Sequence, residues 1–89
     1  MPEVQDAAVK IYSKPGWGPC DIVKSFFDRN DVDYTTYSVV GKENREHLLT
    51  YRDLGFDKMP AVVAPELDPF AGVDAPNMLK VAQKYGSAE

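Results

Sequence analysis

The sequence has little of the chemistry that marks metalloproteins or disulfide-rich proteins. Its 89 residues include one cysteine, Cys20, and one histidine, His47. A single cysteine cannot form a disulfide within the chain, and His47 has no Cys, Asp or Glu at metal-ligand spacing on a site-like loop. We therefore expect no metal site, no internal disulfide and no resident cofactor, and we expect His47 to lie on the surface.

A basic face and a long apolar segment are also missing. Lys and Arg number 10 against 14 Asp and Glu, and they do not line up, which argues against nucleic-acid binding. No apolar run approaches the roughly 20 residues of a membrane span, and no signal-peptide pattern opens the chain. The sequence thus predicts a monomer in the reducing cytoplasm that binds neither membrane nor nucleic acid.

Hydrophobic periodicity and the turn residues predict seven elements. We expect strands at 7–12, 34–40, 61–64 and 70–71, and helices at about 19–30, 43–54 and 75–85. The apolar residues at helical spacing predict the buried face of each helix. They are Ile22, Val23, Phe26 and Phe27 in the first helix, Leu48, Leu49, Tyr51 and Leu54 in the second, and Met78, Leu79, Val81, Ala82 and Tyr85 in the third.

The resulting order β-α-β-α-β-β-α predicts an α/β fold. The first β-α-β unit implies a parallel strand pair with a right-handed crossover, and the last two strands are close enough for an antiparallel hairpin. A four-stranded mixed sheet with helices on both faces follows. Residues 1–89 read as a single domain, with residues 1–6 a loose end.

The Gly- and Pro-rich loop at 13–18 leads from the first strand into Cys20 at the start of the first helix. Cationic neighbours and the positive end of a helix dipole favour a thiolate at such a place, so Cys20 is a candidate reactive thiol with a lowered pKa. Its alternative role is that of a small buried residue on the inward face of the helix.

Four features in this order resemble the glutaredoxins of the thioredoxin superfamily, above all the short phage and bacterial glutaredoxin-like proteins that reduce ribonucleotide reductase. They are Tyr12-Ser13-Lys14-Pro15, Cys20 at a helix start, Met59-Pro60 before an apolar strand, and Gly72-Val73-Asp74 before the last helix. The resemblance covers nearly the whole chain and implies a thioredoxin-like fold.

The resemblance also implies an active site of the pattern Cys-x-x-Cys, and here the chain departs from it. Cys20 falls on the second cysteine position, and Trp17 stands where the first, nucleophilic cysteine is expected. A dithiol mechanism needs one thiolate to attack and the second to resolve. One thiol cannot complete that cycle, so any activity would depend on glutathione or on another protein's thiol.

Two ends of a glutathione site are implied by the resemblance. Lys14 corresponds to the lysine near the glycine carboxylate, and Gly72, Val73 and Asp74 correspond to the turn that holds the γ-glutamyl end. The simpler alternatives are a solvated loop lysine and an aspartate that only caps the last helix.

The resemblance further implies that Met59-Pro60 is a cis bond and that the Met59 backbone pairs with a bound peptide or glutathione. Without it, a trans proline at the start of an edge strand would be favoured, since only about 5% of X–Pro bonds are cis. Trp17 either forms a docking surface over Cys20 or folds back over Pro15 or Pro60.

These expectations lead to two main functions. The first is a glutaredoxin-like thiol–disulfide redox protein, an oxidoreductase by family, that carries electrons to a disulfide-containing protein such as ribonucleotide reductase through Cys20, with glutathione as co-substrate. The second is a redox-disabled binding module for glutathione, an extended peptide or a partner protein. A structural or regulatory subunit that uses only the scaffold is a third.

Overall fold

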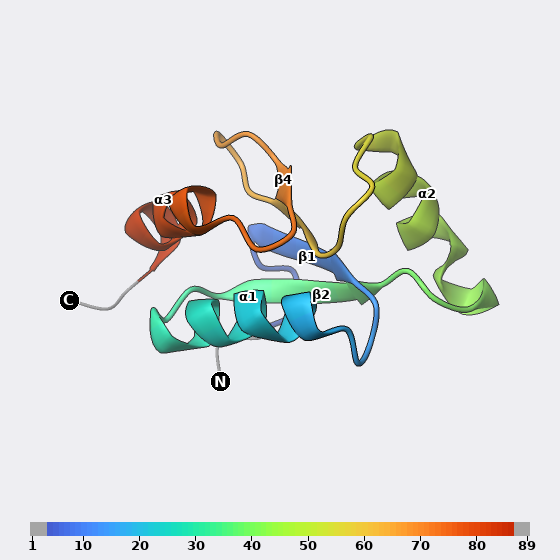
Figure 1. Cartoon of the computed structure of the whole chain (residues 1–89), viewed down its shortest axis with the longest axis horizontal. Coiled ribbons are helices and arrows are strands. Elements are labelled where there is room, and N and C mark those ends of the chain that lie inside the picture. The colour runs from blue at the N-terminus through green and yellow to red at the C-terminus, as the bar shows by residue number, and fades with distance from the viewer. Residues whose placement is uncertain (1–3, 87–89) are drawn as a thin grey trace.

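A computed structural model describes residues 4–86 and has the predicted order of elements (Figure 1). The strands are β1 (Val9–Ser13), β2 (Tyr34–Ser38), β3 (Ala61–Val63) and β4 (Phe70–Ala71). The helices are α1 (Gly18–Arg29), the short 3₁₀ helix η1 (Lys42–Asn44), α2 (Arg45–Asp53) and α3 (Ala75–Tyr85). The strands form one sheet in the order β2-β1-β3-β4, in which β1 and β2 are parallel and the other pairs are antiparallel. The predicted α/β fold with a mixed sheet is confirmed.

Two separate apolar clusters show that helices cover both faces of the sheet. On one face Val9 and Ile11 of β1 pack with α1 and α3, and on the other Tyr12 packs with Tyr51 of α2. This alternation follows from the two-residue period of a strand. Figure 1 shows α2 and α3 towards opposite ends of the molecule.

Three apolar residues that we expected in the buried helix faces are instead exposed. The exposed fractions of Ile22, Leu49 and Leu79 lie between 44% and 54%. Each precedes or follows a better buried neighbour, and one position along a helix rotates a side chain by about 100°. The buried stripe of each helix is therefore narrower than the run of apolar residues.

Residues 4–6, which we expected to belong to a loose end, are held against β2. The Val4 N–H donates to the Tyr34 carbonyl at 2.9 Å, and the Thr35 hydroxyl donates to the Val4 carbonyl at 2.8 Å. The same hydroxyl oxygen accepts from the Ala7 N–H. Residues 1–3 lie outside the described residues.

We expected His47 to lie on the surface, but its side chain is half-buried. Its ring stacks on Tyr37 with 4.4 Å between centroids, and Tyr12 lies beside both rings. Since Tyr37 belongs to β2, this contact helps to seat α2 on the sheet.

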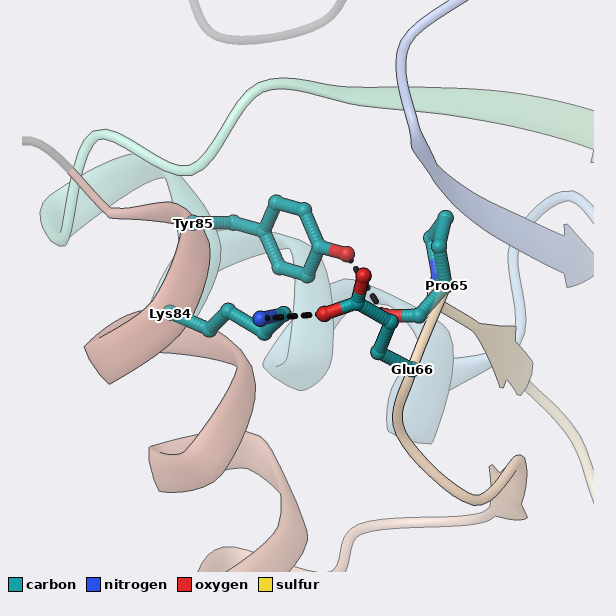
Figure 2. Close-up of polar contacts among 4 residues, drawn as sticks. All are labelled: Pro65, Glu66, Lys84 and Tyr85. Atoms are coloured by element: carbon teal, nitrogen blue, oxygen red, sulfur yellow. Dashed lines mark hydrogen bonds and ion pairs between the residues drawn. The ribbon is translucent and has the colours of Figure 1, made fainter.

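The C-terminal end of α3 is attached to the turn between β3 and β4 (Figure 2). The Tyr85 hydroxyl donates to the Pro65 carbonyl at 2.6 Å, and Lys84 forms an exposed ion pair with Glu66 at 2.8 Å. At the other end of α3, the Asp74 carboxylate accepts from the Asn77 N–H, as expected of an N-cap. Both ends of α3 are thus fixed.

Among residues 4–86, none of the helices has the length and apolar character that crossing a membrane requires.

Candidate functional site

A cleft of about 530 Å³ opens where three loops meet. The loops are the one before α1, the segment before β3, and the turn between β4 and α3. The residues that line it are Lys14, Trp17, Pro19, Tyr51, Asp57, Lys58, Met59, Gly72 and Val73. The structure therefore brings five of the candidate site residues together in one cleft, namely Lys14, Trp17, Met59, Gly72 and Val73.

Trp17 lies at the mouth of this cleft and is 46% exposed, so it does not fold back into the core. Its backbone N–H donates to the Lys14 carbonyl at 3.2 Å across a tight turn, in which Gly16 has a φ of 78° that suits glycine. The Lys14 ammonium lies 5.9 Å from the centroid of the indole ring, within the range of a cation–π contact. The loop thus presents an aromatic face and a positive charge side by side.

Cys20 lies three positions further on and has a different environment. It is 1% exposed and is not among the residues that line the cleft. Burial raises the pKa of its thiol, and a hydrogen bond from the Lys14 backbone and the charge of Lys24 offset this only in part. Our expectation of a lowered pKa is therefore wrong, because desolvation disfavours the thiolate more than the Lys14 backbone hydrogen bond and the Lys24 charge favour it, and Cys20 is instead the small buried residue of the alternative.

Pro60 and Asp74 lie next to lining residues without lining the cleft themselves. The Met59–Pro60 peptide bond is cis, and the Pro60 carbonyl accepts from the Gly72 N–H at 2.8 Å, which ties two of the three loops together. The Asp74 carboxylate is engaged with the backbone and the side-chain amide of Asn77.

Four lining residues were not among the sequence candidates: Pro19, Tyr51, Asp57 and Lys58. Asp57 and Lys58 directly precede Met59, and this proximity in the sequence could have marked them as candidate site residues. Tyr51 gave no such signal, because its place in the cleft depends on how α2 packs. Its hydroxyl donates to the Lys58 carbonyl at 2.7 Å, and burial, with a smaller contribution from the charge of Asp57, raises its pKa.

The cleft combines apolar walls with two lysines and one aspartate. Within residues 4–86, neither Lys14 nor Lys58 forms an ion pair, so both charges are available to an anionic ligand. Aromatic and aliphatic contacts come from Trp17, Val73 and Met59. Such a lining suits a short peptide that carries carboxylates. In the described part of the chain no three His, Cys, Asp or Glu side chains lie close enough to hold a metal ion.

The strand order, the helices on both faces and the cleft beside the start of α1 define a protein of the thioredoxin-like class. Within this class, the sequence profile described as Glutaredoxin matches residues 9–66, which is more than half of the chain. The chain belongs to the glutaredoxin family. Membership supports a redox function of the glutaredoxin type in general terms.

Solved structures agree on the fold. The crystal structure of glutaredoxin grx-1 from Archaeoglobus fulgidus matches with a TM-score of 0.73 and 18% identity, over 86% of this chain and 87% of that one. The glutaredoxin-like NrdH-redoxin from Escherichia coli matches with a TM-score of 0.70 and 22% identity, over 91% and 97%. The thioredoxin-like protein BC3987 matches with a TM-score of 0.64 and 28% identity, over 82% and 97%. No curated protein sequence matches the chain.

Proposed function

We propose that this chain is a glutaredoxin-type thiol–disulfide protein that binds glutathione or an extended cysteine-bearing peptide in its cleft and exchanges disulfides through Cys20 alone. One observation carries the proposal. Five residues chosen from sequence because of a resemblance to a glutathione site line one cleft of suitable size and charge.

The cleft offers a partner to each part of such a ligand. Lys14 is placed to meet a carboxylate as a point charge. Within residues 4–86 no hydrogen bond engages the N–H or C=O of Met59, so this backbone is available to pair with an extended peptide. The turn at Gly72 and Val73 closes the far side, where the γ-glutamyl end of glutathione would lie.

The exchange step balances only with an external thiol. The Cys20 thiolate attacks a disulfide R–S–S–R′, forms Cys20–S–S–R and releases R′S⁻, which takes up a proton. Glutathione thiolate then attacks the mixed disulfide, releases R–S–S–glutathione and restores the Cys20 thiol. Because Cys20 is 1% exposed, the first turn of α1 must open locally before attack, so the exchange is slow.

The proposed protein partner is a disulfide-bearing enzyme such as ribonucleotide reductase, because the chain resembles glutaredoxin-like proteins that reduce that enzyme. The need for a thiol supply places the proposed activity in a reducing compartment such as the cytoplasm.

A redox-disabled binding module is the second candidate, and the environment of Cys20 favours it. A thiol that is almost fully buried and has a raised pKa is a poor nucleophile at neutral pH. In this case the cleft binds the same ligands, and Cys20 contributes only to packing.

Binding and exchange can be tested separately. Reduced glutathione is titrated into the ¹⁵N-labelled protein, and we expect shifts at residues 14–17, 57–59 and 72–73. Lys14→Ala should weaken binding by about ten-fold, the value of one charge-assisted hydrogen bond. Lys42→Ala removes the same charge from the 3₁₀ helix η1, outside the cleft, and should leave binding unchanged.

Oxidised glutathione is then added, and the mass of the protein and the rate of Cys20 alkylation are followed against pH. A glutathione adduct on Cys20 in the folded protein supports exchange. Binding without an adduct, with alkylation only after unfolding, supports the binding module. The absence of both binding and adduct contradicts both candidates.

A further inference from the structure

Tyr51 connects α2 with the wall of the cleft, and neither candidate function assigns it a role. Tyr51 is 7% exposed and packs with Tyr12, Val39 and Ala61 on the face of the sheet that α2 covers. Its hydroxyl reaches the Lys58 carbonyl at 2.7 Å. The ring is therefore fixed by the core, and the hydroxyl is held at a defined point of the 57–59 segment.

This contact is the main polar attachment of that segment. Among the hydrogen bonds of residues 4–86, the bond from Tyr51 is the one that reaches residues 56–59; the bonds on either side end at Gly55 and begin again at Pro60. A backbone segment with few hydrogen bonds opens more readily, so each bond that it has matters to its position. The side chains of Phe56 and Met59 also pack against the cluster that contains Tyr51, and the Tyr51 hydroxyl supplies the polar part of what positions the Met59 backbone.

The attachment extends to the opposite wall of the cleft. A methyl group placed on Gly72 would lie 3.4 Å from Cδ of Lys58, so the Lys58 stem passes directly over this turn. The Gly72 N–H in turn donates to the Pro60 carbonyl. Tyr51, the 57–60 segment and the turn at Gly72 therefore form one connected chain of contacts around the cleft.

We propose that Tyr51 is a positioning residue for ligand binding, whose hydroxyl holds the Lys58 carbonyl and so presents the Met59 backbone to an extended ligand. The inference rests on the proposed function for its ligand, but the holding of the segment is a property of the protein alone. Tyr51 acts through the backbone of its neighbours and takes no part in thiol chemistry.

The chain provides a matched control for the loss of this hydroxyl. Tyr85 makes the same kind of bond, from a phenol to the Pro65 carbonyl at 2.6 Å, at the C-terminal end of α3 and away from the cleft. Tyr51→Phe and Tyr85→Phe each remove one such bond and keep the ring. We expect similar small decreases in melting temperature for both.

Two measurements separate positioning from general stabilisation. The first is the affinity for reduced glutathione by calorimetric titration. It should fall by up to about five-fold in Tyr51→Phe, the value of one neutral hydrogen bond that holds the segment, and stay at the wild-type value in Tyr85→Phe. The second needs no ligand. The backbone ¹⁵N order parameters of residues 57–59 should fall in Tyr51→Phe and not in Tyr85→Phe.

Equal affinities and equal order parameters in the two variants would overturn the inference. If the wild-type protein binds no glutathione at all, the proposed function fails. The order parameters then still decide whether Tyr51 holds the segment.

Discussion

At the residue scale, two side chains at the start of α1 separate two properties that a reactive cysteine combines, namely solvent exposure and a thiol. Trp17 is exposed and lines the cleft, whereas Cys20 is buried and does not line it. Exposure and a low pKa are what make a thiol reactive, and the exposed position in this chain carries an indole. The cleft therefore offers binding groups at its surface, whereas the Cys20 thiol is shielded from solvent in the closed structure.

Trp17→Cys should restore a dithiol and with it disulfide reductase activity. The new thiol would stand in the cleft lining, beside Lys14 and three positions before Cys20, so that one thiol can attack the substrate disulfide and the second can resolve the mixed disulfide. Reduction of a mixed glutathione disulfide in a coupled assay measures it. Trp17→Ser, which removes the ring without supplying a thiol, is the control. Equal activity in the two variants would show that the rest of the site no longer supports exchange.

At the element scale, sequence patterns predicted which segments form helices and strands better than how the helices are rotated. The strand at β1 and the cap at Asp74 follow from local chemistry, a two-residue period and a carboxylate before a helix. The exposure of Ile22 and the contact from Tyr51 to Lys58 follow from tertiary packing, which no single segment encodes. The burial of Cys20 also follows from tertiary packing, and so its pKa could not be predicted from its place at a helix start.

Asp74 allows the capping of α3 to be separated from ligand binding. Asp74→Ala removes the acceptor of the Asn77 N–H and should lower the free energy of unfolding by about 1 kcal/mol. Asp74→Asn keeps a cap without the charge, so its stability in urea should stay near the wild-type value. Any loss of glutathione affinity in Asp74→Asn then reports a charge contact with the ligand. If Asp74→Asn lowered the free energy of unfolding as much as Asp74→Ala does, the capping role would be contradicted.

At the scale of the whole molecule, three buried titratable side chains make folding sensitive to alkaline pH. Burial raises the pKa of the Cys20 thiol above its ordinary value of 9.0 and the pKa values of Tyr12 and Tyr51 above 10.0. Cys20 belongs to α1, whereas Tyr12 of β1 and Tyr51 of α2 pack together in one apolar cluster. A pH high enough to ionise these groups therefore destabilises the packing on both faces of the sheet.

The free energy of unfolding should therefore fall as the pH rises above about 9. A group whose pKa is higher in the folded than in the unfolded protein stabilises the fold fully below the unfolded pKa, and this stabilisation is lost as the pH rises through the folded pKa. Urea unfolding followed by circular dichroism between pH 7 and pH 11 measures the loss. In Cys20→Ala the earliest part of the decrease, near the thiol pKa, should be absent, and the part due to the two tyrosines should remain. A free energy that stays constant across this range would mean that these groups ionise as readily in the fold as in the unfolded chain. Cys20 would then be as accessible to base as a free thiol, and the case for a binding module without redox chemistry would lose its main support.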